Sequence, residues 1–436
     1  MGRQISAGPY REREMTVNKL RGRFAVSAFS TLVSGLILST PAHATNGYFS
    51  NGYNPQSKAM AGSGVAVDNG VLGLAQNPAL GFRVGNGAEG CITLFAPERG
   101  FTIGGAAPLT PGSYSSENNL FAIPCGGANF RLNDRSTVGF VIYGNGGMNT
   151  EYVGNPFAGL GAGTSPLGVN LEQVFMSVSF AYQINDALSL GIAPVFAAQR
   201  FSATGLQAFG AMSTNPAALT NNGDDWSHGW GLNLGMAWEP SAEWTIGASY
   251  RTRMQMDQFR SYAGLFAEQG DFDIPATATL GAAYTPAAYS NLTLTAEFQR
   301  IFFSDVAAIS NSGALLATPL GANNGPGFGW KDMNVVRAAA IYRASPRLTL
   351  RGGVSYATDF TDDNEVLLNV LAPATIRWHA SFGASYAMKN GWELSGAFTH
   401  ALEAEKSGSN LTPGFGQPVT LSMYQNELSI GLSYKW

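Results

Sequence analysis

The sequence predicts an all-β fold, a transmembrane barrel of fourteen antiparallel strands, and three observations support this prediction. Charged residues make up only 12% of the chain, about half the share of an ordinary soluble domain, whereas glycine contributes 54 of its 436 residues. Apolar residues alternate with small or polar ones in many segments, as in strands that face lipid on one side and a lumen on the other. Beyond residue 44, no uninterrupted apolar stretch reaches the length of about 18 residues that indicates a membrane helix.

Residues 1–44 are predicted to be a signal peptide and not part of the fold. A basic region precedes an apolar stretch from Ala25 to Leu38, and Ala42-His43-Ala44 has the small-residue pattern of a cleavage site. The alternative is a membrane anchor, but the apolar stretch is shorter than the roughly 20 residues that span a bilayer. Met1 and Met15 are alternative starts of this leader. We therefore expect an exported protein in the outer membrane of a Gram-negative cell.

Residues 45–87 are predicted to form an N-terminal hatch, or plug, inside the lumen, and residues 88–436 to form the barrel. The segment 45–87 is rich in glycine and alanine and contains no alternating stretch long enough to span a membrane. Fourteen strands enclose a lumen that is too wide for wall side chains alone to fill. Without a segment inside it, such a barrel would be an open pore.

The last strand shows the alternation most clearly. Leu428 and Ile430 fall on one face, whereas Glu427 and Ser429 fall on the other. The same pattern places the strands at about 88–96, 120–132, 136–144, 171–183, 187–200, 229–239, 243–254, 274–284, 290–303, 332–343, 347–357, 375–386, 391–403 and 424–436. Short turns alternate with long loops between them, which is the asymmetry of bacterial outer-membrane barrels. The chain ends on Trp436, and we expect the barrel-assembly machinery to bind this aromatic terminus.

Other functional classes find little support in the sequence. Cys91 and Cys125 lie in neighbouring predicted strands, and they either form a structural disulfide in the oxidising periplasm or stay unpaired. No His or Cys spacing suits a metal, and His379 has no Ser-His-Asp set around it, so no metal, cofactor or enzyme activity is expected. The net charge of −4 becomes more negative once the basic leader is removed, which argues against a nucleic-acid partner.

Three motifs at the start of the mature chain carry a family resemblance. They are Thr45–Phe49, Ser57–Ala66 and Asn77-Pro78-Ala79, and together they resemble the FadL family of outer-membrane transporters, which includes fatty-acid channels and TodX-type hydrocarbon channels. Similar stretches follow at 146–152, 259–276 and 330–356. One departure is Leu371-Ala372-Pro373-Ala374, where the family pattern leads us to expect an Ile-Pro-Asp type sequence.

This resemblance implies a monomeric barrel with an N-terminal hatch. It also implies that hydrophobic small molecules are captured by an apolar groove in the outer loops, pass the hatch, and diffuse passively through a gap in the wall into the outer-membrane lipids. Long-chain fatty acids are the first expectation for the cargo, and aromatic hydrocarbons or alkanes are the nearest alternative. A general porin or a surface adhesin is the competing class, but a plugged lumen argues against a porin.

Two outer loops carry apolar residues at helix-like spacing, and we expect these residues to form the outer groove. They are Phe259, Tyr262, Leu265 and Phe266 in the loop 255–273, and Leu206, Phe209 and Met212 in the loop 201–228. The alternative is that the two stripes only pack the loops together.

Arginines of the predicted strands are candidates for binding a substrate carboxylate. Alternation points Arg337, Arg351 and Arg377 inward, and arginine binds carboxylates through two parallel hydrogen bonds. The alternative is a salt-bridge network in the lumen, with partners such as Glu297, Glu393 and Glu427.

The remaining candidates concern the gate and the wall. Asn77, Pro78 and Ala79 are candidate gate residues of the hatch, or else a purely structural turn. Gly144, Gly146 and Gly147 are expected to kink the wall and open a gap in it, or else to begin an ordinary outer loop.

Overall fold

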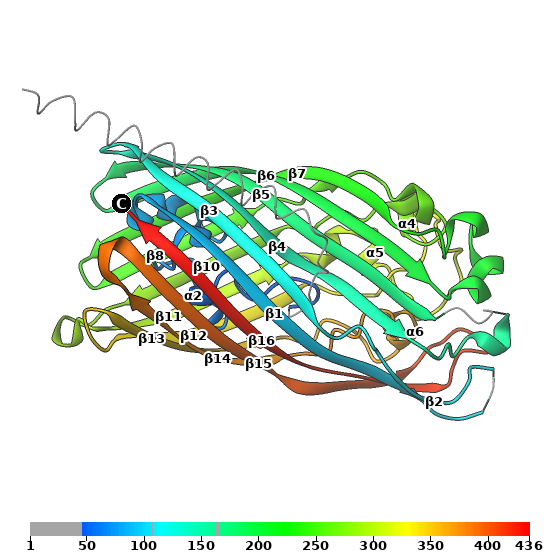
Figure 1. The fold of residues 1–436 in the computed structure, drawn as a ribbon. Coiled ribbons are helices and arrows are strands. Elements are labelled where there is room, and N and C mark those ends of the chain that lie inside the picture. The colour runs from blue at the N-terminus through cyan, green and yellow to red at the C-terminus, as the bar shows by residue number, and fades with distance from the viewer. Residues whose placement is uncertain (1–45, 107, 162–165) are drawn as a thin grey trace, which may run out of the picture. The chain divides into compact units, whose positions relative to one another are not determined.

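Fourteen strands close into one antiparallel barrel in the computed structural model, which describes residues 46–106, 108–161 and 166–436. Neighbouring strands of the barrel follow one another in the sequence, and β16 (Pro418–Lys435) pairs with β1 (Gly87–Ile103) to close the sheet. Figure 1 shows the barrel from the side. Closure gives every barrel strand a hydrogen-bonded neighbour on each side, which suits a lipid environment that offers the backbone no other partners. The predicted signal peptide, residues 1–44, lies outside the described residues.

The predicted number and order of barrel strands are confirmed. The other barrel strands are β3 (Phe121–Asn133), β4 (Ser136–Tyr152), β5 (Leu167–Asn185), β6 (Leu188–Thr204), β7 (Asp225–Ser241), β8 (Trp244–Arg251), β10 (Thr277–Tyr284), β11 (Leu292–Ile301), β12 (Met333–Arg343), β13 (Leu348–Ala357), β14 (Trp378–Ala387) and β15 (Trp392–Ser409). Two short strands, β2 (Gly112–Ser115) and β9 (Gln255–Met256), pair with β1 and β7 at the loop end.

Several strands extend further toward the outer loops than predicted. β4 continues to Tyr152, and β1 continues to Ile103, well past the predicted ends at 144 and 96. The alternation fades in these extensions because loops and neighbouring segments bury both faces, as in residues 145–150 of β4. The alternation of apolar and polar residues therefore identifies the part of each strand that faces lipid. It does not identify the part of the strand that continues into the outer loops.

The inside and outside faces follow the predicted alternation. On β16, Leu428 and Ile430 are 48% and 50% exposed, whereas Glu427 and Ser429 are only 2% and 1% exposed. Nearer the loops the inward face of the same strand becomes apolar, with Val419, Leu421 and Met423 all buried. The interior is thus polar toward the short turns and apolar toward the long loops.

The long loops gather at one end of the barrel, with α4, α5 and α6 at the right of Figure 1. The short helices of these loops are η3 (Ala158–Leu160), η4 (Gln207–Met212), η5 (Pro216–Ala218), η6 (Arg260–Tyr262), α4 (Ala267–Gly270), η8 (Phe303–Asp305), α5 (Ala307–Ser310) and α6 (Val366–Asn369). At the opposite end, η7 (Ala287–Tyr289) and η9 (Lys389–Gly391) lie in short turns. Among the described residues, no helix combines the length and the apolar character needed to cross a membrane.

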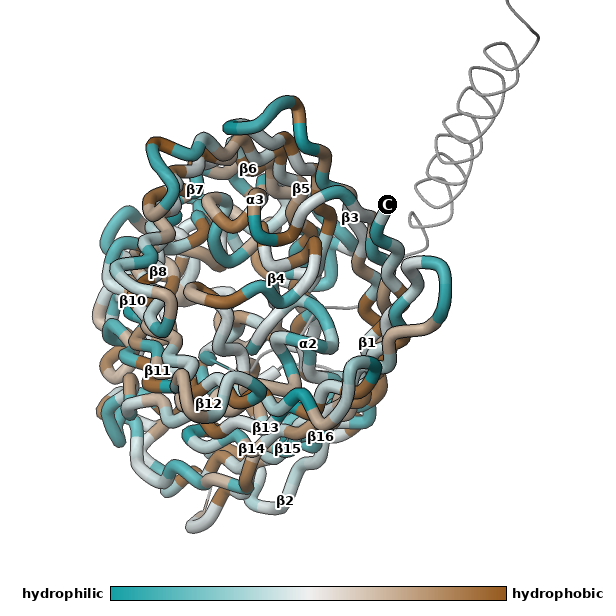
Figure 2. The backbone as a smooth tube through the Cα atoms, turned by 90° about the vertical axis from the view of Figure 1, so that its left-hand side faces the viewer, coloured by the Kyte–Doolittle hydropathy of each residue, from teal (hydrophilic) through white to brown (hydrophobic). Residues whose placement is uncertain are grey.

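Residues 46–86, which we call the N-terminal segment, pack against the inward faces of the strands. Its helices are α2 (Pro55–Lys58), η1 (Val71–Ala75), η2 (Pro78–Leu80) and α3 (Gly81–Val84). Viewed along the barrel in Figure 2, α2 and α3 lie within the ring of strands. Most residues of the segment are buried, including polar ones such as Asn54, Ser57 and Asn77.

Inward-facing glycines of the strands make room for this segment. A Cβ atom at Gly191 of β6 would lie 2.4 Å from the backbone nitrogen of Ala79, and one at Gly235 of β7 would lie 2.1 Å from the Asn77 Oδ1. Both distances are far inside van der Waals contact, so only glycine permits this approach. The glycine content of the strands therefore reflects the fit between the wall and the N-terminal segment.

Buried charges also join the segment to the wall. Lys58 of α2 pairs with Glu427 of β16, and both side chains are at most 4% exposed. On the other side, the Glu297 carboxylate of β11 accepts hydrogen bonds from the backbone N–H groups of Gly64 (2.8 Å) and Val65 (2.9 Å). Removing one member of a buried ion pair leaves the other charge buried without a partner, which costs several kcal/mol of stability. These contacts therefore strongly favour one position of the segment inside the barrel.

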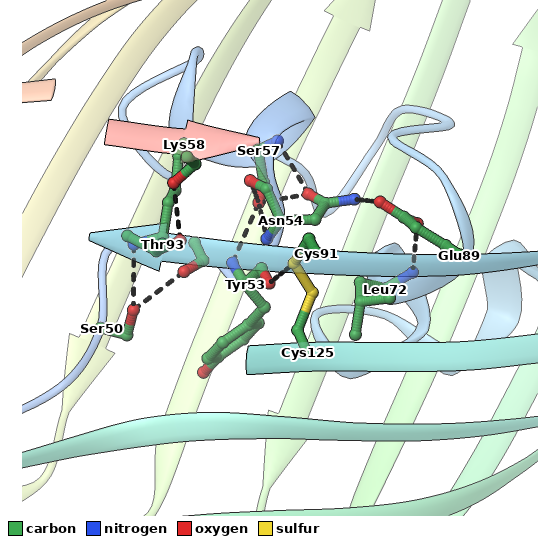
Figure 3. The surroundings of a disulfide bond; sticks show 12 residues. Ser50, Tyr53, Asn54, Ser57, Lys58, Leu72, Glu89, Cys91, Thr93 and Cys125 are labelled. Carbon is green, nitrogen blue, oxygen red and sulfur yellow. Dashed lines mark hydrogen bonds between the residues drawn. A yellow bond between two sulfur atoms is a disulfide. The ribbon is translucent and has the colours of Figure 1, made fainter. Parts of the chain in front are cut away.

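A disulfide links Cys91 of β1 to Cys125 of β3, whose Cα atoms lie 4.9 Å apart as direct partners in the ladder. Figure 3 shows the bond beside the N-terminal segment, where Cys91 approaches the carbonyl oxygen of Tyr53. Glu89, two residues before Cys91, accepts from the Asn54 Nδ2 (2.9 Å) and from the Leu72 backbone N–H (3.1 Å). This part of the wall therefore holds both α2 and η1.

Replacing Cys91 and Cys125 together by alanine is expected to lower the free energy of unfolding by about 2–4 kcal/mol. The bridge closes a loop across a sequence separation of 34 residues and so restricts the unfolded chain. The urea midpoint of the barrel in lipid vesicles measures this effect, with the reduced wild type as the matched control. Equal midpoints for the oxidised wild type and the double variant would show that the bridge adds no stability.

Candidate functional site

The predicted groove residues of the loop 255–273 lie together in a buried aromatic cluster. The ring of Phe201, on β6, lies 5.5 Å from Phe259, 4.8 Å from Tyr262 and 4.7 Å from Phe266 between centroids. Phe259 and Tyr262 are fully buried, and Leu265 is 8% exposed. The predicted helical stripe is present only as the single turns η6 and α4.

The residues of the loop 201–228 belong to the same cluster. Leu206 and Phe209 are buried and Met212 is half-buried, with the Phe209 ring 4.9 Å from Phe157 and 5.9 Å from Phe415. The two loops contact each other directly, because the Gly264 N–H donates to the Ala218 oxygen at 2.8 Å. The structure thus brings both predicted stripes together, but as a closed apolar cluster and not as an open groove.

The cluster continues inward through residues that were not predicted as site residues, although Tyr48 and Trp330 lie in stretches that resemble the family. Trp330 is buried among Phe303, Phe328 and Phe360, and its Nε1–H donates to the Asn369 Oδ1 at 2.7 Å. Tyr48 of the N-terminal segment lies 5.8 Å from Phe303. The aromatic pairs Phe302-Phe303 and Phe328/Trp330, at the two ends of the loop 302–332, are the sequence signal that would have identified part of this set.

Ionisable groups surround the outer part of the cluster. Burial, with the nearby carboxylates of Asp273 and Glu268, raises the pKa of Asp271 to about 7. The Asp273 carboxylate accepts from the Arg253 Nε at 2.7 Å. Burial also raises the pKa of Glu365, which accepts from the Ser312 hydroxyl at 2.6 Å. These acidic groups flank the cluster without entering it.

The wall changes its pairing beside the predicted glycine kink. The β3–β4 ladder runs from Asn133↔Ser136 to Gly126↔Ile142, and beyond this point β3 pairs with β1 while β4 pairs with β5. The β4–β5 register shifts between Gly144 and Gly146, which makes Asn145 the extra residue of a bulge. We call residues 121–125 of β3 and 143–147 of β4 the β3–β4 seam.

The N-terminal segment supplies hydrogen bonds to the bulge. The Ser50 N–H donates to the Asn145 oxygen at 2.7 Å, and the Gly147 N–H donates to the Tyr48 oxygen at 2.9 Å. A Cβ atom at Gly146 would lie 1.7 Å from that same Tyr48 oxygen, so glycine is required for this approach. The start of the segment therefore lies directly against the inner side of the seam.

The three predicted lumen arginines differ in their surroundings. Arg337 is buried and donates to the Glu297 Oε1 at 2.9 Å, which is the ion pair of the alternative interpretation. Arg351 donates to the Ser385 hydroxyl at 2.6 Å and lies in the field of the carboxylates of Glu393, Asp68 and Glu89. Arg377 does not lie in the lumen, where it was predicted to point. It precedes the first residue of β14 and pairs with Asp359 at the outer rim, where strand alternation no longer applies.

Asn77, Pro78 and Ala79 form a tight turn against β6 and β7. The Asn77 Oδ1 accepts from the Ala79 N–H at 3.0 Å and caps η2, with Pro78 as its first residue. Its Nδ2 donates to the Val65 oxygen (2.7 Å) and to the Met236 oxygen of β7 (2.9 Å). This asparagine therefore links two parts of the N-terminal segment to the wall.

Comparison of the sequence with known families gave a match over nearly the whole chain. The sequence profile described as "Outer membrane protein transport protein (OMPP1/FadL/TodX)" matches residues 36–434. A search of curated protein sequences found no match.

Solved structures share the fold. The P. putida toluene transporter TodX superposes with a TM-score of 0.68 and 20% identity, over 88% of this chain and 99% of that one. A Pseudomonas aeruginosa FadL homologue gives a TM-score of 0.68 and 16% identity, over 89% of this chain and 99% of that one. The Ralstonia pickettii toluene transporter TbuX gives a TM-score of 0.61 and 20% identity, over 88% of this chain and 99% of that one.

Proposed function

The chain belongs to the outer membrane protein transport protein family (OMPP1/FadL/TodX), whose barrels take up hydrophobic compounds, and we propose that its own cargo is long-chain fatty acids. The observation that carries the proposal is a buried apolar cluster that is continuous from the outer loops to the seam. It extends from Phe209 and Phe259 in the outer loops to Tyr48 and Phe49 of the N-terminal segment, and on to Tyr143 at the seam. An alkyl chain gains ~0.8 kcal/mol for each CH₂ group that it buries in such surroundings, whereas a hydrated sugar or ion gains nothing.

Capture begins in the outer loops. Phe259, Tyr262, Leu265 and Phe266 part from Leu206, Phe209 and Met212 and receive the alkyl chain between them. The loops that carry these residues contain only short helices such as η4, η6 and α4, so little regular structure has to be broken for them to separate. The loops close again when the ligand has passed inward, which keeps the cluster away from water.

The N-terminal segment acts as the hatch in this route. Its first residues are bonded to the bulge of β4 through Ser50 and Tyr48, and its turn at Asn77-Pro78-Ala79 is held by β6 and β7. A shift of residues 46–50 would release the hydrogen bonds at Asn145 and Gly147 while Asn77 keeps the rest of the segment seated. Gating of this kind opens the seam without opening the whole bore to water.

Exit takes place sideways through the β3–β4 seam into the outer-membrane lipids. The seam has lost the ladder between β3 and β4, and Gly144 and Gly146 flank its bulge. Side chains that cross the seam, such as Ile123 where it approaches Gly144, have to move for an alkyl chain to pass. Passive diffusion toward lipid needs no energy source.

Export and assembly complete the proposal. The leader 1–44 directs the chain out of the cytoplasm, and the barrel-assembly machinery binds the C-terminal Trp436. This side chain is 50% exposed and lies 5.6 Å from the Phe130 ring on the outer surface, where it is accessible to a partner. The barrel is a single chain and works as a monomer.

Deletion of the gene is expected to abolish growth on oleate as sole carbon source and to leave growth on toluene or an alkane unchanged. The wild-type gene should restore growth on oleate, and mass spectrometry of the protein purified from native membrane should identify a fatty acid. Unchanged growth on oleate in the deletion strain would refute the proposal.

Import of aromatic hydrocarbons is the second candidate. The toluene transporters TodX and TbuX share the fold, although identities of 20% show the fold alone. Loss of growth on toluene with normal growth on oleate, in the same deletion strain, would favour this candidate over fatty acids.

A further inference from the structure

We propose that Arg251 binds the carboxylate of the transported fatty acid at an inner site beside the β3–β4 seam, an inference that rests on the function proposed above. Arg251 is the last residue of β8, and alternation points it inward. A head-group site at this place would make the protein a carrier of acids in preference to neutral hydrocarbons.

Arg251 is a buried cation whose charge has no acidic partner. Its side chain is 5% exposed, and it donates hydrogen bonds to two neutral groups, the Asn145 Oδ1 at 3.0 Å from Nη1 and the Tyr143 hydroxyl. Its Nε–H is buried without an acceptor, and within the described ranges no aspartate or glutamate forms an ion pair with it. A buried guanidinium normally has a carboxylate partner, because an uncompensated charge is costly in a medium of low dielectric constant. A ligand with a carboxylate group can supply the missing acidic partner.

The surroundings of Arg251 can hold both ends of an amphipathic molecule. A cavity of about 40 Å³ lies on one side of it, lined by polar groups such as Ser50, Gln76 and Thr277. Arg251, Arg337 and Glu297 are the charged groups of this lining, and the last two neutralise each other, so the cavity carries one net positive charge. A cavity that holds one water needs roughly 10–15 Å³, so this one has room for a carboxylate group.

Aromatic rings also lie close to the guanidinium. Its central carbon is 5.2 Å from the Phe49 ring and 5.0 Å from the Phe175 ring. Both rings belong to the apolar cluster that reaches from the outer loops to the seam. A fatty acid can therefore place its head at Arg251 while its alkyl chain stays within the cluster.

Binding at Arg251 would also act on the seam. The Asn145 side chain that accepts from Arg251 belongs to the bulge, and its Nδ2 donates to Gln173 (3.1 Å), which in turn donates to Gln199 (3.0 Å). With its amide donors used along this chain, Asn145 can offer Arg251 only its oxygen. A carboxylate is the stronger acceptor and would displace that oxygen, which loosens Asn145 at the point where the ladder is already broken.

The test compares an acid with its neutral analogue on the intact mature barrel in lipid nanodiscs. Titration with oleate and with oleyl alcohol, read out by calorimetry at pH 8, gives both dissociation constants. For Arg251→Met we expect the constant for oleate to rise by roughly 10- to 100-fold, as for loss of a hydrogen bond to a charged group, while that for oleyl alcohol stays within about twofold. Arg251→Lys should recover part of the affinity for oleate.

Arg347→Met serves as the charge control, because it removes one cation from an exposed turn far from the cluster. Heat-dependent gel mobility of each variant checks that the barrel is folded. Equal weakening of oleate and oleyl alcohol would show that Arg251 only supports packing, and unchanged binding of oleate would exclude it as the head-group site. A wild type that binds toluene but no oleate would instead overturn the fatty-acid proposal itself.

Discussion

Replacing Gly191 by valine is expected to convert the closed barrel into a pore that conducts ions. A Cβ atom at this position would lie 2.4 Å from both the Ala79 nitrogen and the Pro78 carbonyl carbon, which are backbone atoms of the N-terminal segment. These atoms can move only if the turn at Asn77 leaves β6 and β7, and the hydrogen bond from the Asn77 Nδ2 to the Met236 oxygen of β7 then breaks as well. A lumen of fourteen strands from which this segment is displaced is too wide for the wall side chains to seal.

Planar-bilayer recordings of the purified variant, and sensitivity of cells to large hydrophilic antibiotics, measure this effect. Gly352→Val is the matched control, because the nearest atom to a Cβ at Gly352 is 3.7 Å away. The control should stay as silent as the wild type. Silent bilayers for a folded Gly191→Val barrel would mean that the segment does not seal the bore.

Replacing Phe259 and Phe266 together by aspartate is expected to abolish oleate uptake while the amount of protein at the cell surface stays normal. Both rings pack on Phe201 in the buried cluster, where a carboxylate would lie among apolar side chains. Ionised side chains would open the cluster to water, at a cost of several kcal/mol for each buried charge, and the alkyl chain would lose its first binding surface. The barrel ladder lies below these loops and should assemble as before.

Uptake of radiolabelled oleate and surface labelling of whole cells measure the two halves of this prediction. Tyr289→Asp is the control, because this aromatic residue is 66% exposed in a turn at the opposite end of the barrel. Normal oleate uptake by the double variant would reject the loops as the capture site.

The strands could be predicted where one face meets lipid and the other meets the lumen. On β16 the exposed Leu428 and the buried Glu427 follow the alternation, so both the strand and its orientation were evident. The outer part of β4 could not be predicted, since Asn145, Met148 and Asn149 are buried on both sides of the strand and no alternation remains. Periodicity reports the environment of a strand and fails where that environment is the same on both faces.

The residue types of the candidate site could be predicted from the sequence, but the burial and the partners of these residues could not. The stripes at Phe259 and Phe209 were identified from spacing, but their burial depends on how two loops distant in sequence pack together. Arg251 lay in a predicted strand and pointed inward, yet its lack of an acidic partner becomes visible only when the N-terminal segment and the bulge at Asn145 are in place. Glycine within a strand, as at Gly191 and Gly235, indicates that another backbone segment can approach closely. The glycine content alone did not show at which of these positions the N-terminal segment contacts the wall.

The measurement that tests the central claim most directly is permeation into proteoliposomes that contain only the wild-type barrel. Our account predicts that oleate enters faster than in protein-free vesicles, as followed by an internal pH dye, while potassium ions and trisaccharides stay excluded. Free passage of the sugar, or entry of oleate no faster than without protein, would contradict a closed barrel that carries hydrophobic cargo.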